Sequence, residues 1–137
     1  MRIRALVLAA IASLAVLAGC GDDKDTSTEA KTFCSVVKPV QDLGSALENA
    51  DNTKTVQTAF TAAENAFNTV GSTPPSDIKT DFETVKRIFT AANDALKKAS
   101  YSVDAAGAAS PKAIEDLEGV EFQRAADNIQ TWSTKNC

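Results

Sequence analysis

The spacing of apolar residues is the feature of this sequence that most restricts its fold. Along three long segments they recur every three or four positions, which places them on one face of an α-helix. No segment shows the period-two alternation typical of a half-buried β-strand. The sequence therefore predicts an all-α domain. The apolar faces are Phe33, Val36, Val37, Val40, Leu43 and Leu47 in the first segment, Val56, Phe60, Ala63, Phe67 and Val70 in the second, and Ile78, Phe82, Val85, Phe89, Ala92, Leu96 and Ala99 in the third.

Prolines and a glycine indicate where these helices begin and end. Pro39 lies inside the first segment, so either the helix kinks there or a regular helix begins near Lys38 with the proline in its first turn. The second helix should end at Gly71, a good C-terminal stop. Pro74 and Pro75 then predict the start of the third helix.

The outer surface of the third segment is charged. Glu83 lies four residues before Arg87, and Asp94 lies four residues before Lys98. We expect each pair to lie side by side on a solvated helix face. Residues 102–110 are mostly small and are expected to form a loop.

The last segment would be unfavourable as one straight helix. Glu118 and Glu121 would then lie within its apolar face, and burying unpaired carboxylates costs free energy. A break at Gly119 removes the problem by giving a short helix at 111–118 and a longer one at about 120–135. A working acid pair of Glu118 and Glu121 is the alternative. The residues expected to be buried are Ile114 and Leu117 in the short helix and Phe122, Ala125, Ala126, Ile129 and Trp132 in the long one.

Together these segments predict an up-down-up-down four-helix bundle, with an extra short helix at about 111–118 before the last long helix. In such a bundle the start of the first helix and the end of the fourth lie at the same end. Cys34 and Cys137 occupy these two positions, so we expect them to form a disulfide bond in an oxidising compartment. The alternative, a redox-active thiol, is not supported by a Cys-x-x-Cys spacing or a neighbouring histidine.

The N-terminal segment carries an export signal. Arg2 and Arg4 precede an uncharged apolar run at residues 5–18. A basic start, a short apolar run and small residues at its end are typical of a secretory signal peptide. At about 14 residues the run is too short to span a hydrocarbon core of ~30 Å comfortably.

The end of this run gives a more specific signal. Leu17-Ala18-Gly19-Cys20 resembles the lipobox of bacterial lipoproteins. The resemblance implies cleavage between Gly19 and Cys20 and attachment of a diacylglyceryl group, with acyl chains such as palmitate, to the Cys20 thiol. Two acyl chains anchor a protein stably. An ordinary secretory signal followed by an unrelated cysteine is the alternative interpretation.

Three parts of the chain follow from this signal. We expect residues 1–19 to be a lipoprotein signal peptide, residues 20–31 a flexible tether, and residues 32–137 the helical bundle domain. Features along the whole chain are similar to those of small uncharacterised lipoproteins of actinobacteria. These features are the lipobox, the polar tether, the Phe33-Cys34 pair, Pro74-Pro75 and Cys137. The resemblance implies a secreted helical bundle, and it implies no activity.

Composition excludes several classes of function. Without residues 1–19, 118 of the 137 residues remain; the loss of Arg2 and Arg4 leaves 12 basic against 18 acidic side chains and a net charge of −6. This charge does not suit nucleic acid. The sequence contains no histidine, which excludes Ser-His-Asp and Cys-His catalysis and the usual zinc and di-iron sites. We expect no cofactor, no metal and no enzymatic activity.

The sequence therefore predicts an extracytoplasmic lipoprotein on the outer face of the cell membrane. Its expected role is non-enzymatic binding of a protein or cell-envelope component. The alternative is a carrier that holds a small apolar ligand between its helices. A candidate binding surface is the polar, nearly uncharged outer face of the second helix, which consists of Thr55, Gln57, Thr58, Thr61, Asn65 and Asn68.

Overall fold

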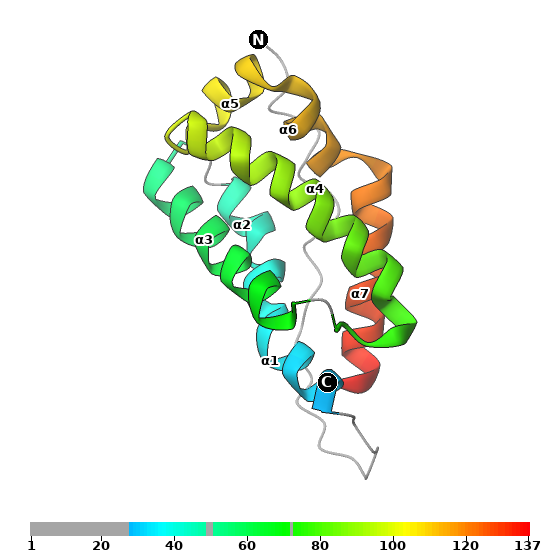
Figure 1. Cartoon of the computed structure of the whole chain (residues 1–137). Helices are drawn as coiled ribbons and strands as arrows, with labels where there is room; N and C mark the ends of the chain where they lie inside the picture. The colour runs from blue at the N-terminus through cyan, green and yellow to red at the C-terminus, as the bar shows by residue number, and fades with distance from the viewer. Residues whose placement is uncertain (1–27, 49–50, 72) are drawn as a thin grey trace.

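The computed structural model describes residues 28–48, 51–71 and 73–137, and these residues are almost entirely helical (Figure 1). No β-strand occurs within these ranges, so the predicted all-α class is confirmed for them. The α-helices are α1 (Thr28–Gln41), α2 (Leu43–Glu48), α3 (Thr53–Val70), α4 (Lys79–Lys98), α5 (Val103–Ala109), α6 (Pro111–Glu118) and α7 (Val120–Asn136), and a short 3₁₀-helix, η1 (Ser76–Ile78), precedes α4.

The helices pack as two groups around one core. α3 packs along α1 and α2, whereas α4 packs against α6 and α7 and meets α5 near its C-terminal end (Figure 1). The two groups meet where α1 contacts α7 and where α3 contacts α4. The apolar faces predicted from the sequence point into this core, and Val56, Phe60 and Leu96 are fully enclosed there.

A row of aromatic rings joins the two groups. Neighbouring ring centroids lie 4.9–5.9 Å apart. Such pairs contribute about 0.5–1.5 kcal/mol each beyond the burial of their area. The contacts between these rings therefore hold α1 and α3 against α4 and α7. In order, its members are Trp132, Phe33, Phe82, Phe67, Phe89 and Phe60.

At Pro39 the structure supports the first of the two interpretations. α1 begins well before the proline, continues to Gln41 and gives way to α2 at Leu43. The alternative of a helix that begins near Lys38 is wrong. Proline has no N–H to continue the helical hydrogen bonds, and the interruption follows within one turn of it.

α1 also begins earlier than expected. The predicted tether, residues 20–31, overlaps the helix, whose first residue is Thr28. Ala30 is buried beneath the first turn, and Glu29 is favourably placed near the positive end of the helix dipole. Residues 28–31, which were expected in the tether, therefore belong to helix α1.

The loop expected at residues 102–110 is a helix, α5. The Ser102 side chain accepts a hydrogen bond from the Ala105 N–H at 3.3 Å and caps the helix start. Ala106 is completely buried. Alanine is the best helix former, and the burial of Ala106 supplies the tertiary packing that a helix of seven residues needs.

The break at Gly119 is confirmed. α6 ends at Glu118 and α7 begins at Val120, while Gly119 adopts an extended conformation. Glu118 and Glu121 are both exposed, so the costly burial of two carboxylates is avoided. Leu117 is buried as expected, and Ile114 is half-buried against the core. In α7 Ala125 and Ile129 are buried, and the remaining predicted positions, Phe122, Ala126 and Trp132, are partly buried.

Candidate functional site

Cys34 and Cys137 meet at one end of the helices. Cys34 lies in the second turn of α1 and Cys137 directly follows α7; their sulfur atoms are 2.05 Å apart and their Cα atoms 5.5 Å apart. Beside them the Phe33 ring packs edge-on against Trp132, with centroids 5.4 Å apart. The predicted disulfide pair is therefore observed, and it fixes the beginning of α1 to the end of α7.

The other predicted functional residues lie outside the described part of the chain. They are Cys20, which we expect to be lipidated, and the cleavage motif Leu17, Ala18 and Gly19. The described chain begins at Thr28, so eight peptide steps separate Cys20 from the first residue of α1.

None of the helices in the described part of the chain combines the length and the apolar character needed to cross a bilayer.

The candidate binding surface on α3 is accessible. Gln57, Thr58, Thr61, Asn65 and Asn68 are exposed, and Thr55 is half-buried. We call this set the polar α3 face. Its threonine and amide side chains are neutral, so removing water from them costs less than desolvating charged groups. The geometry suits a broad polar contact and holds no arrangement of catalytic groups.

An ion pair borders this face. The Lys97 ammonium on α4 donates to the Glu64 carboxylate on α3 at 2.7 Å. This hydrogen bond is the main cause that raises the pKa of Lys97 above the ordinary lysine value of 10.5, and the charges of Glu64 and Asp94 add to it. Both side chains remain well exposed, so the pair contributes little to stability.

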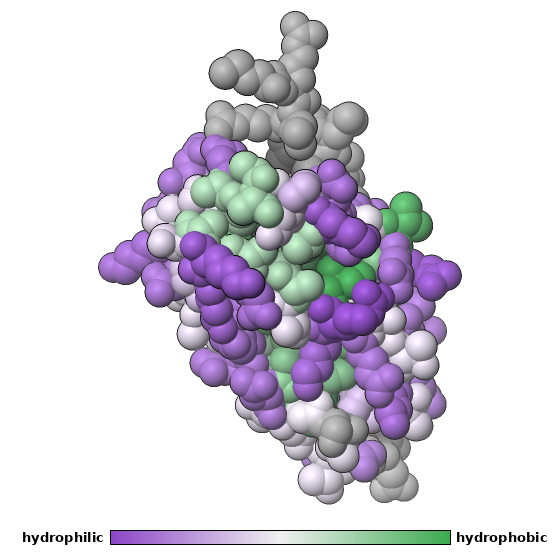
Figure 2. Space-filling view, turned by 45° about the horizontal axis from the view of Figure 1, so that its top comes forward, coloured by the Kyte–Doolittle hydropathy of each residue, from purple (hydrophilic) through white to green (hydrophobic). Residues whose placement is uncertain are grey.

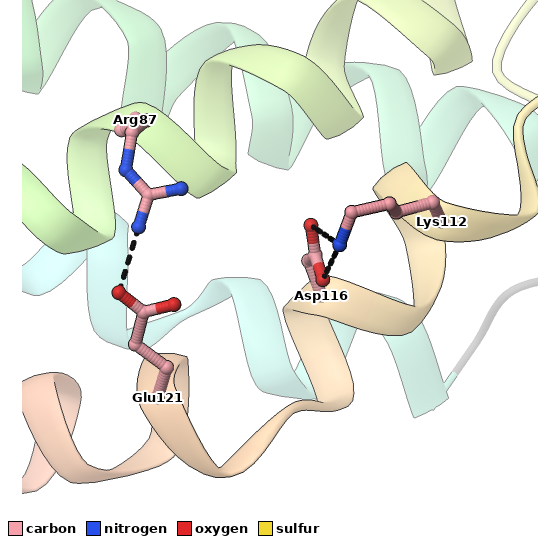
Figure 3. A network of polar contacts seen from close by, with 4 residues as sticks. All are labelled: Arg87, Lys112, Asp116 and Glu121. Atoms are coloured by element: carbon pink, nitrogen blue, oxygen red, sulfur yellow. Dashed lines mark hydrogen bonds and ion pairs between the residues drawn. The ribbon is translucent and has the colours of Figure 1, made fainter.

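The charged face predicted along the third segment is solvated: Glu83, Arg87, Asp94 and Lys98 are all exposed on α4. Arg87 donates to Glu121 on α7 at 2.7 Å, and Figure 3 shows this link between the two helices. Local spacing indicated neighbours on the same helix, whereas the packing of α4 on α7 brings a carboxylate of another helix within reach of Arg87.

A second exposed ion pair lies near the Arg87–Glu121 link. On α6 the Lys112 ammonium contacts the Asp116 carboxylate at 2.9 Å (Figure 3). These residues are four positions apart on one helix, a spacing that supports α6 by only about 0.2–0.5 kcal/mol. Neither pair encloses a cavity, and both side chains of the Arg87–Glu121 link are mostly solvated.

An apolar pocket of about 20 Å³ lies beneath α1. A volume of this size accommodates roughly one water molecule, so this pocket is too small to hold an apolar ligand. The cavity is lined by Phe33, Val36, Val37, Val40, Ala66, Phe67, Val70, Phe82, Val85 and Ile129.

The sequence did not predict two buried polar side chains of the described region, Asn93 and Ser133. The Ser133 hydroxyl donates to the Ile129 carbonyl oxygen at 2.8 Å. Asn93 on α4 is only 2% exposed, and its Oδ1 atom has no hydrogen-bond partner. The burial of Asn93 could have been predicted from its position four residues after Phe89 and three before Leu96, because this spacing places it on the apolar face of α4.

Within residues 28–48, 51–71 and 73–137, no three acidic or cysteine side chains converge closely enough to hold a metal ion. Comparison of the whole chain with protein-family models, curated proteins and solved structures gave no match.

Proposed function

We propose that this protein is a lipid-anchored extracytoplasmic module that binds a protein or a cell-envelope component without catalysing a reaction. The observation that carries the proposal is the sequence Leu17-Ala18-Gly19-Cys20 at the end of a short apolar run. A signal of this kind supports export, cleavage before Cys20 and lipidation of its thiol. Two acyl chains then hold the protein on the outer face of the membrane.

The pairing of Cys34 with Cys137 supports the same location. Structural disulfides persist in oxidising compartments and are rare in reducing ones. An exported domain of this size gains stability from such a bond, because its single core is small. The two cysteines that remain after lipidation of Cys20 would thus form a stabilising disulfide bond outside the cell.

We propose further that the scaffold is an elaborated up-down-up-down four-helix bundle. The four antiparallel helices of this bundle are α1 continued by α2, then α3, then α4, and finally α6 continued by α7. The packing of α3 on α1 and α2 and of α4 on α6 and α7 supports it. The polar α3 face is the surface we propose for partner binding, because it is exposed, extended and nearly uncharged.

Replacement of Cys20 tests the anchor. We expect Cys20→Ala to abolish lipidation, so that the protein is released from the membrane or remains as an unprocessed precursor. Fractionation of cells that express the full chain, followed by detection of the protein, measures this. The matched control is the double variant Cys34→Ser, Cys137→Ser, which removes the other cysteines and should remain on the membrane. Unchanged processing and attachment of Cys20→Ala would refute the proposal.

A further inference from the structure

The positions of the two chain ends restrict how an anchored molecule sits on its membrane. The Cys34–Cys137 bond and the Phe33–Trp132 contact hold the start of α1 beside the end of α7. η1 also contacts α7, and Asn128 donates to Asp81 in the first turn of α4 at 3.1 Å. We call this region, with the start of α1, η1 and the end of α7, the bridged end.

α5 and the beginning of α6 lie at the opposite end of the molecule, which we call the far end (Figure 1). α4 connects the two ends and has 20 residues. At 1.5 Å per residue it is about 30 Å long. The far end is therefore about 30 Å from the point where the chain enters α1.

The segment before α1 is short compared with this length. Eight peptide steps separate Cys20 from Thr28. Whatever its conformation, a segment of eight peptide steps reaches at most about 28 Å. A lipid on Cys20 therefore keeps the start of α1 within about 28 Å of the membrane surface, whereas the far end can lie farther away.

We infer that the protein is held with its disulfide-bridged end next to the lipid headgroups and displays the far end outward. The inference rests on the proposed lipid anchor at Cys20. The bridged end is thus the surface that faces lipid, whereas α5 and the beginning of α6 face away from the membrane. Figure 2 shows pale green surface at the far end, where α5 carries the exposed residues Ala105, Ala108 and Ala109.

Energy transfer from a dye on the protein to dyes on lipid headgroups tests this orientation. The lipidated full chain is purified and reconstituted into phosphatidylcholine vesicles that carry acceptor-labelled headgroups. The donor is attached to one introduced thiol, Ser76→Cys at the bridged end or Ala109→Cys at the far end. Both positions are exposed small residues. Intact mass confirms a single label and a retained Cys34–Cys137 bond.

We expect transfer from position 76 to exceed transfer from position 109 by about twofold or more, since the two ends are about 30 Å apart. A matched control inserts about 20 Gly and Ser residues after Thr26, which gives a reach near 30 Å and should reduce the difference. Equal transfer from both positions, or more from position 109, would overturn the orientation. Failure of the wild-type chain to associate with vesicles would instead overturn the proposed anchor.

Discussion

Asn93 is the residue whose position in the core is least favourable. Its Oδ1 atom is buried without a hydrogen-bond partner, and leaving such a group unsatisfied costs about 1–3 kcal/mol. Its neighbours along the apolar face of α4, Phe89 and Leu96, are buried apolar residues. The protein therefore loses stability at this position.

Replacing this amide by an apolar side chain of similar size should recover part of the loss. We expect Asn93→Leu to increase the free energy of unfolding by about 1 kcal/mol. Urea unfolding followed by the fluorescence of Trp132, the only tryptophan, measures the change. Asn65→Leu at an exposed position of α3 is the matched control and should have little effect. A loss of 1 kcal/mol or more in Asn93→Leu would contradict the absence of a partner for Oδ1.

Among the elements, α1 and α7 depend most on a covalent link. The Cys34–Cys137 bond joins residues 103 positions apart. In the chain-entropy description, closing a loop of this length contributes up to about 4.7 kcal/mol, and typical measured values are about 2–4 kcal/mol. Cys137 directly follows the last helical residue, so the bond also prevents the C-terminal turn from fraying.

Removing both sulfurs should therefore destabilise the fold. We expect the double variant Cys34→Ser, Cys137→Ser to lose about 2–4 kcal/mol of unfolding free energy. Urea unfolding of this variant and of the wild type without reductant gives the difference. The wild type with reductant should behave like the double variant. A difference below about 0.5 kcal/mol would show that the bond does not constrain the unfolded chain.

The elements that the sequence predicted well are those with a strong local signal. The faces of α3 and α4 follow the three-and-four spacing of Phe60, Phe67, Phe82 and Phe89, and all four are buried. Gly71 ends α3 with a positive φ of 64°, which glycine adopts without the strain of a side chain. The break at Gly119 was predictable because an unbroken helix would have buried charged groups.

The elements that the sequence did not predict lack such a signal. α5 contains alanines and a serine cap, and its helical state depends on burial of Ala106 against the rest of the domain. The first turn of α1 is polar apart from Ala30. Arg87 and Lys97 form ion pairs with carboxylates on other helices. The packing of the helices determines which carboxylates lie within reach of these two side chains, and the local sequence does not show it. Pairing of Cys34 with Cys137 was predictable only because the expected topology placed both at one end.

At the scale of the whole molecule, the proposed lipid anchor is close to the folded domain along the chain. The described fold begins at Thr28, eight peptide steps after Cys20. The start of α1 is fixed to α7 by the disulfide, so a force on the proposed anchor would act on both helices. The polar α3 face is the part of the outer surface that we propose for binding.

The central claim is that Cys20 becomes the lipidated first residue of the mature protein. Mass spectrometry of the N-terminal peptide of the protein purified from its own membrane tests it most directly. We predict a peptide that begins at Cys20 and carries the added mass of a diacylglyceryl group on the thiol. A mature chain that begins at another residue, or one with an unmodified Cys20, would contradict the account.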